Sequence, residues 1–207
     1  MDLRPPLKVL AAKLADCCEG CGVTYALIGG YAAGAYAQAP DTRDVDACVD
    51  IAPDESARIE ALLEALQAAG FRINVEALKR RAASGRAILF LQYGLVRLDV
   101  MLRKPDGYWD EALKHRRVAS VEGRDYWIAS PEDLILLKLI AGREKDYPTV
   151  ELVAATQLRR LDLERLRAGA RRLAAKVPEL PEQVEAVLLK AAEIDRLASL
   201  PPGDEQP

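Results

Sequence analysis

The sequence predicts an α/β or α+β fold, in which a small mixed β-sheet carries packed helices and a C-terminal helical subdomain follows. Alternating apolar and polar residues at 44–50 and 95–102 predict strands, because successive side chains of a strand point to opposite faces. Apolar residues recur at helical spacing in 6–20 and 53–70, before and after the first of these strands. From Thr149 onward the chain is rich in Leu, Ala, Glu and Arg, which predicts helices alone.

The remaining elements follow from the same two periodicities. The segment 79–86 carries basic side chains and is expected to be a loop between two strands. Two interpretations stay open for it: a solvated surface loop, or a contact for a triphosphate or a polyanionic acceptor. We expect a hairpin of 87–92 with 95–102, and another across 122–124. Further strands are expected at 25–28, 71–73, 118–121 and 126–128, and further helices near Tyr31, at 109–114, from Ser130, and at 151–158, 163–176 and 181–197.

Length and composition bound the class of protein. The 207 residues predict one domain or a small pair of subdomains. We expect a core in 1–128, a C-terminal helical subdomain in 129–199, and a disordered tail in 200–207, which has nothing to bury. A net charge of −3 provides no overall basic field for nucleic acid, so any such contact must be local. Neither a membrane-spanning run nor a secretory signal is recognisable, so we expect a cytoplasmic protein with no membrane partner.

Asp44 and Asp46 are the first candidate site residues. They lie two residues apart in a predicted strand and therefore point to the same face, about 6.6 Å apart along the chain. Val45 and Ala47 point to the opposite face, toward a core. Two carboxylates on one face repel each other unless a cation lies between them. The pair therefore indicates a divalent metal with oxygen ligands, and a solvated strand face is the alternative.

Asp99 is a third acid, placed in the apolar strand 95–102. Burying an unpaired carboxylate among aliphatic side chains is unfavourable, so Asp99 requires a partner. Two interpretations stay open: a salt bridge to a nearby arginine, or a strand position beside Asp44 and Asp46 that completes a three-carboxylate metal site.

Gly29 and Gly30 follow the apolar run 25–28 and precede a short predicted helix. Glycine allows a tight turn and a close approach of a ligand, and the first N–H groups of a helix attract phosphate. A plain turn is the alternative interpretation. Beside an acidic metal site, however, a phosphate-binding turn indicates phosphoryl or nucleotidyl transfer.

Other kinds of site are not favoured by the sequence. Cys18 and Cys21 have a CxxC spacing, but no second pair of this kind follows, so a structural zinc site is not expected. The only histidine, His115, lies in a basic segment, where a general base is not expected.

These motifs together resemble the nucleotidyltransferase superfamily related to DNA polymerase beta. The resemblance is carried by Ile28-Gly29-Gly30, by Thr42-Arg43-Asp44-Val45-Asp46, and by Asp99 in a later apolar strand. Polymerase-type members carry a serine after the first glycine, where this chain has Gly30. The Thr-Arg-Asp-Val-Asp string and the segment 130–146 resemble one branch in particular, the nucleotidyltransferase toxins of abortive-infection toxin–antitoxin systems and their uncharacterised relatives.

The resemblance implies a nucleotidyltransferase core that uses two Mg²⁺ ions and a nucleoside triphosphate, ATP among the candidates. The implied metal ligands and catalytic residues are the three acids, Asp44, Asp46 and Asp99. The implied contacts to the nucleotide come from two glycines and two basic residues, namely Gly29, Gly30, Arg43 and Lys138. The glycines would cradle the β- and γ-phosphates, and the basic side chains would offset charge on the α-phosphate or the leaving pyrophosphate.

The implied reaction is transfer of a nucleoside monophosphate to a hydroxyl acceptor, such as a tRNA 3′ end or a protein side chain. A toxin of this kind would have a cognate antitoxin as a partner. Two alternatives stay open. The chain could be a catalytically inactive nucleotidyltransferase-fold binding module, such as an antitoxin, or a small-molecule nucleotidyltransferase of the aminoglycoside-modifying type.

Overall fold

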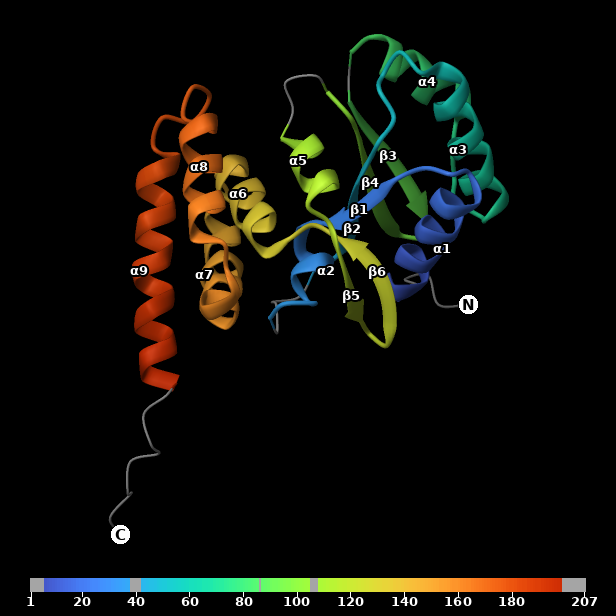
Figure 1. Cartoon of the computed structure of the whole chain (residues 1–207). Helices are drawn as coiled ribbons and strands as arrows, with labels where there is room; N and C mark the ends of the chain where they lie inside the picture. The colour runs from blue at the N-terminus through green and yellow to red at the C-terminus, as the bar shows by residue number, and fades with distance from the viewer. Residues whose placement is uncertain (1–5, 38–41, 86, 105–107, 199–207) are drawn as a thin grey trace. The chain divides into compact units, whose positions relative to one another are not determined.

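The computed structural model describes residues 6–37, 42–85, 87–104 and 108–198, and its contacts divide the chain into two units (Figure 1). Unit 1 comprises Met1–Ala35 and Ala39–Ser130, and unit 2 comprises Tyr36–Gln38 and Pro131–Pro207. The boundaries that the sequence analysis placed after residues 128 and 199 stay predictions. The tail 200–207, predicted to be disordered, lies outside the described residues.

Unit 1 is built on a six-stranded mixed sheet of order β3-β4-β2-β1-β6-β5. Strands β1 and β6 are parallel, as are β2 and β4, and the other neighbours are antiparallel. This sheet confirms the predicted α/β class and both predicted hairpins. The strands are β1 (Tyr25–Ile28), β2 (Asp44–Val49), β3 (Ile88–Tyr93), β4 (Val96–Leu102), β5 (Arg117–Val121) and β6 (Arg124–Ile128).

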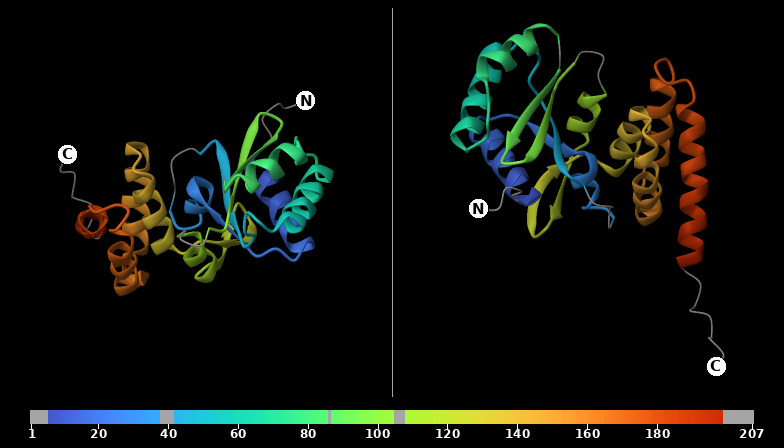
Figure 2. Two further views of the ribbon diagram at one scale, coloured as in Figure 1. Left: turned by 90° about the horizontal axis from the view of Figure 1, so that it is seen from above. Right: turned by 180° about the vertical axis from the view of Figure 1, so that it is seen from behind.

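The described part of unit 1 also contains α1 (Leu7–Gly20), α2 (Gly29–Ala33), α3 (Ser56–Ala68), α4 (Val75–Ala83) and α5 (Trp109–Lys114). Figures 1 and 2 show α1 and α3 over one face of the sheet and α2 and α5 on the other. Leu14 of α1 and Leu66 of α3 are fully buried, as is Val45 of β2. These apolar side chains form the core, so the opposite faces of β2 and β4 remain for polar residues.

Two predictions about the region between α3 and β3 were wrong. The basic segment 79–86 is not a loop throughout, because Val75–Ala83 forms α4. Asn74 caps this helix, since its side chain accepts a hydrogen bond of 2.9 Å from the Ala77 N–H. The strand expected at 71–73 is reduced to one isolated antiparallel bridge, between Arg72 and Gln92.

Unit 2 is helical, as the sequence predicted. Its described elements are α6 (Pro131–Ala141), the 3₁₀ turn η1 (Glu144–Asp146), α7 (Tyr147–Gln157), the 3₁₀ turn η2 (Leu158–Arg160), α8 (Leu163–Leu173) and α9 (Leu180–Ala198). Helix α7 begins four residues before the predicted start at 151, because Pro148 in its first turn favours helix initiation there. No helix in the described ranges is long and apolar enough to cross a membrane.

A buried ionic cluster holds α6 against α8 within unit 2. Glu132 and Asp133 of α6 are fully buried. Arg165 of α8 donates hydrogen bonds of 3.0 and 3.1 Å to the two carboxylate oxygens of Asp133 and also pairs with Glu132. Buried carboxylates require such partners, so these first-turn acids serve helix packing as well as helix initiation.

Candidate active site

The three predicted acids share one face of the sheet in unit 1. Asp44 and Asp46 lie in β2, and Asp99 lies in the neighbouring parallel strand β4. The register places Asp46 opposite Asp99 and Asp44 opposite Arg97. Because directly opposed residues point to the same face and adjacent strands lie about 4.8 Å apart, the three carboxylates form one acidic group.

Arg97 bridges this acidic group. Its Nη2 donates a hydrogen bond of 3.1 Å to Asp44 Oδ2, and its Nε lies 2.8 Å from Asp99 Oδ1. The salt bridge of Asp99 to a nearby arginine, one of the two interpretations of its sequence context, is therefore present. The Arg97 side chain is 52% exposed, so this arginine lies at the solvent-facing surface of the acidic group.

Asp99 is the most buried of the three acids, with 6% of its surface exposed. Burial raises the pKa of its carboxyl above the usual value, the Arg97 guanidinium opposes that rise, and the Asp44 carboxylate adds to it. Asp99 Oδ1 is buried, and its described partner is the Arg97 Nε, 2.8 Å away. A buried carboxylate oxygen that already faces a cationic side chain is suited to bind a cation.

The Gly-Gly turn packs directly against β2. Gly29 has φ of +71°, and a Cβ atom at this position would overlap the Asp46 carboxylate. A Cβ atom on Gly30 would lie 2.7 Å from Thr42 Oγ1. Both positions therefore require glycine, one for conformation and space and the other for space.

Thr42 is a site residue to which the sequence analysis gave no role. Its hydroxyl lies beside Gly30 and donates to the Asp44 backbone oxygen and to Asp44 Oδ1, at 3.3 Å each. The hydroxyl thus lies close to where a side chain at position 30 would begin. The position of Thr42 in the Thr42–Asp46 string was the available sign of such a role. Its contact with Gly30, however, depends on the folding of the turn.

The donor set of the acidic group fits a hard divalent cation such as Mg²⁺, which prefers carboxylate oxygens. The carboxylates of Asp99 and Asp46, which are directly opposite each other, supply oxygens on one face. As they stand, no three acidic, thiol or imidazole side chains of the described ranges lie close enough to hold a metal ion. In this arrangement the Arg97 guanidinium is the cation paired with Asp44 and Asp99.

The two basic residues predicted to contact the nucleotide lie in different units. Arg43 is exposed and immediately precedes β2, close in sequence to the acidic pair. Lys138 belongs to α6 of unit 2, is 7% exposed, and donates a hydrogen bond of 2.8 Å to Asp146. The charge of Lys138, which lies in an apolar stretch of the sequence, is thus paired with a carboxylate of its own unit. Its contact with a phosphate stays a prediction.

Phe90 was missed by the sequence analysis. It lies in β3 directly opposite Asp99, and 45% of its surface is exposed. Arg81 of α4 lies over its ring, with 4.9 Å from the guanidinium carbon to the ring centroid. The signal was weak, because an aromatic residue in a strand usually belongs to the core.

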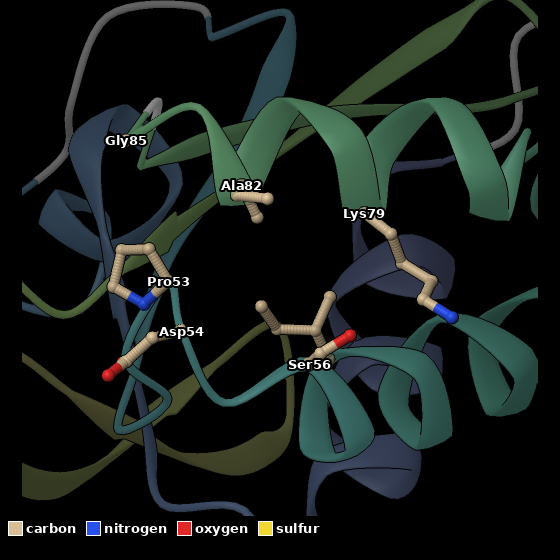
Figure 3. Close-up of a pocket in the computed structure, with 8 residues that line it drawn as sticks. Pro53, Asp54, Ser56, Lys79, Ala82 and Gly85 are labelled. Carbon is tan, nitrogen blue, oxygen red and sulfur yellow. The ribbon is translucent and has the colours of Figure 1, made fainter.

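A separate hollow of about 270 Å³ lies between α3 and α4 (Figure 3). Figure 3 shows Ala82 pointing from α4 into this hollow, with Pro53 and Ser56 on the α3 side. Lys79 lines it, but its ammonium already pairs with Glu60 at 2.8 Å. None of the three acids lines this hollow, so we do not assign the chemistry to it.

Comparison with solved structures identifies the type of fold. A crystal structure of ANT(2'')-Ia in complex with adenylyl-2''-tobramycin aligns with a TM-score of 0.54 at 14% identity, over 83% of this chain and 99% of that one. A solution structure of the antibiotic-resistance factor ANT(2'')-Ia aligns with a TM-score of 0.55 at 14% identity, over 87% and 97%. The fold is that of a nucleotidyltransferase.

A third structure is a weaker match. A nucleotidyltransferase-like protein from Paracoccidioides brasiliensis aligns with a TM-score of 0.48 at 16% identity, too low to carry an argument. No protein-family model matches the sequence, and no curated protein matches it significantly. The comparisons therefore establish the fold, and the activity must be argued from the site.

Proposed function

We propose that the chain is a metal-dependent nucleotidyltransferase, which transfers a nucleoside monophosphate from a nucleoside triphosphate to a hydroxyl acceptor. One observation carries this proposal: the β2–β4 register sets Asp46 opposite Asp99, with Asp44 beside them and Gly29 packed against Asp46. A glycine turn in contact with acidic side chains can bind a phosphate through its backbone, while the acids bind the metal ions that neutralise that phosphate.

Each residue of the site has a role in this proposal. Asp44, Asp46 and Asp99 would hold two Mg²⁺ ions, which would stabilise charge on the transferred phosphate and lower the pKa of the attacking hydroxyl. The glycine turn, Gly29 and Gly30, offers backbone N–H groups to the β- and γ-phosphates. Arg43 and Lys138 are the proposed partners of the α-phosphate or the leaving pyrophosphate.

The proposed reaction is an in-line displacement at the α-phosphorus. The acceptor hydroxyl oxygen forms a bond to the α-phosphorus, and the bond between that phosphorus and the α,β-bridging oxygen breaks. Pyrophosphate leaves with the bonding electrons of that bond, and the hydroxyl proton passes to solvent water. Asp99 is the acid proposed to hold the ion that lowers the pKa of the attacking hydroxyl, a role that the family resemblance implies.

The acceptor defines the biological role. A hydroxyl at a tRNA 3′ end or on a protein side chain would suit a toxin that is restrained by an antitoxin. The aminoglycoside type is the second candidate, favoured by the likeness to ANT(2'')-Ia, whose crystal structure contains adenylyl-2''-tobramycin. An inactive binding module is the third, and it differs from the others in that it releases no pyrophosphate.

The proposal is tested by incubating the protein and Mg²⁺ with each α-labelled nucleoside triphosphate, in separate reactions with total tRNA, with tobramycin and without an added acceptor. We expect label on one acceptor or on the protein itself, and an equal amount of pyrophosphate. The variant Asp44→Ala with Asp46→Ala is the control. Labelling that survives this double substitution, or that needs no divalent metal, would contradict the assigned site.

A further inference from the structure

The side chain of Thr42 contacts both halves of the proposed site. On one side, a Cβ atom on Gly30 would lie 2.7 Å from Thr42 Oγ1 and 2.8 Å from the Thr42 Cβ atom. On the other side, Thr42 Oγ1 lies 3.3 Å from the backbone oxygen of Asp44 and 3.3 Å from its Oδ1. Thr42 therefore lies between the glycine turn, which is proposed to bind phosphate, and an acid that is proposed to bind metal.

The contact with Thr42 is what keeps position 30 free of a side chain. Gly29 has a positive φ, which disfavours other residues, whereas Gly30 is not among the residues with positive φ. A serine could therefore adopt the backbone conformation of Gly30, but its Cβ atom would overlap Thr42. It follows that the hydroxyl of a serine at position 30 could reach the space that the Thr42 hydroxyl now fills.

The hydrogen bonds of Thr42 are long enough to be exchanged for others. One hydroxyl proton is shared between two acceptors at 3.3 Å each, whereas an O–H···O bond is usually about 2.7–2.8 Å long. Thr42 is also only half-buried. A metal ion on Asp44 would compete with this proton for Oδ1, because both need its lone pairs. The proton would then be available to a phosphate oxygen beside the turn.

We propose that Thr42 is a further phosphate-contacting residue of the triphosphate site. Its hydroxyl donates a hydrogen bond to a non-bridging oxygen of the β- or γ-phosphate at the Gly29-Gly30 turn. This inference rests on the proposed function and adds a residue to the four assigned to the nucleotide.

Threonine suits this position for two reasons. A neutral donor binds phosphate without competing for the acids, whereas a further cation would pair with them as Arg97 does. The branched side chain also restricts χ1, so the hydroxyl stays directed toward the turn and loses little freedom when it binds. The Thr42 methyl carbon lies 3.7 Å from the Cβ position of Gly30, an ordinary packing distance.

The first test separates the hydroxyl from its packing. Thr42→Val keeps the branched shape without the hydroxyl, and Thr42→Ser keeps the hydroxyl. Calorimetric titration of the full chain with Mg²⁺ measures affinity for each ribonucleoside triphosphate and for tripolyphosphate, which carries no base. Thr42→Val should weaken binding of both kinds of ligand about tenfold or more, the range for a lost hydrogen bond to a charged group. Thr42→Ser should bind nearly as the wild type does. Circular dichroism checks folding, and Thr42→Ala is used if Thr42→Val does not fold.

A reciprocal exchange tests the position of the hydroxyl. Thr42→Gly removes the hydroxyl and makes room at position 30, so it should bind triphosphate at least as weakly as Thr42→Val. Adding Gly30→Ser to Thr42→Gly returns a hydroxyl from the other side of the contact and should recover most of the loss. Thr24→Val is the matched control, because Thr24 precedes β1 at the end away from the turn, and it should not change affinity.

Thermal unfolding with Mg²⁺ alone separates a phosphate contact from an effect through Asp44. Without triphosphate, Mg²⁺ should stabilise Thr42→Val at least as much as it stabilises the wild type. A smaller stabilisation of the variant would mean that Thr42 acts by positioning Asp44, and would overturn the inference. Wild-type triphosphate affinity in Thr42→Val would also overturn it, as would an exchange variant that binds no better than Thr42→Gly.

The same measurements distinguish this inference from the proposed function. If the wild type binds triphosphate and Thr42→Val binds it equally, only the role of Thr42 fails. If binding depends on Thr42 but no acceptor triggers pyrophosphate release, the phosphate contact stands and the enzymatic function fails. If the wild type binds neither triphosphate nor tripolyphosphate, both fail.

Discussion

Gly29 and Asp46 pack so closely that residue 29 has no room for a side chain. The Asp46 carboxylate occupies the position where a Cβ atom would lie, and the Gly29 φ of +71° already disfavours other residues. The turn and the acid are therefore coupled: the backbone that is proposed to hold phosphate also fixes one of the acids proposed to hold metal.

Gly29→Ala should damage both functions of this contact. Strain at positive φ and displacement of Asp46 together should lower the free energy of unfolding by about 2 kcal/mol or more, with weaker triphosphate binding. Gly22→Ala is the matched control, because Gly22 has φ of +64° and open space, and should lose about 1 kcal/mol. Urea unfolding compares the two. Equal losses would show that the contact with Asp46 is unimportant.

Arg97 should compete with metal for the acids. Arg97→Gln removes the ion pairs with Asp44 and Asp99, so the metal-free protein should lose about 1 kcal/mol of stability. The same variant should gain more from added Mg²⁺ than the wild type, because the acids no longer have to be released. Thermal unfolding across a Mg²⁺ titration measures both effects. A smaller Mg²⁺ stabilisation of the variant would mean that Arg97 assists metal binding.

The sequence predicted most strands of unit 1 and the common face of the three acids for physical reasons that can be named. Alternation alone placed Asp44, Asp46 and Asp99 on the polar faces of their strands. It did not predict that β2 and β4 are parallel neighbours, because strand order depends on long-range packing. The contacts of Arg97 and Phe90 follow from that order, so they could not be deduced. Helix α4 was missed because its basic residues favoured a loop, and the Asn74 that caps it was not recognised as a helix start.

Lys138 illustrates a different limit. A lysine in an apolar helix indicated a contact with a ligand, but the partner of Lys138 is Asp146. Gly142, with φ of +62°, lies just after the end of α6, and the turn that follows brings Asp146 back to the helix. Both side chains of this pair are 8% exposed. Sequence spacing does not predict the Lys138–Asp146 contact, because this contact depends on the geometry of the turn between the two residues.

Lys138→Met should destabilise unit 2 by about 3 kcal/mol, because Asp146 is left buried with only Arg143 as a partner. Adding Asp146→Leu should recover part of this loss by removing the unpaired charge. Chemical denaturation measures the two variants. If the double variant folds and binds triphosphate with wild-type affinity, Lys138 does not belong to the nucleotide site.

The same pair predicts an acid dependence of stability. Burial raises the pKa of Asp146, but hydrogen bonds from Lys138 and Arg143 outweigh it and hold that pKa below its usual value. Such a carboxyl contributes stability above its unfolded pKa of about 3.9, and this contribution is lost as the pH falls through the lower folded value. Urea unfolding between about pH 2.5 and 5 should therefore show a shallower pH dependence for the double variant. Identical slopes would remove Asp146 as the cause.

The buried cluster of α6 and α8 predicts a contrast within one helix. Arg165→Met removes a cation that pairs with the buried Glu132 and Asp133 and should cost about 3–5 kcal/mol of unfolding free energy. Arg167→Met removes only the half-exposed pair with Glu185, and should change stability by less than about 1 kcal/mol. Similar losses for the two variants would contradict the assigned burial of the cluster.

In the proposed reaction the three acids act together on a triphosphate, so pyrophosphate release reports on all three. The wild type, Asp46→Asn and Asp99→Asn are compared with Mg²⁺, all four ribonucleoside triphosphates and total RNA. The exposed Asp125→Asn of β6 serves as the control. We predict Mg²⁺-dependent release by the wild type and the control, and a loss of about 100-fold or more in each site variant that still folds. Undiminished release by Asp99→Asn would exclude Asp99 from the reaction and rule out a three-acid site.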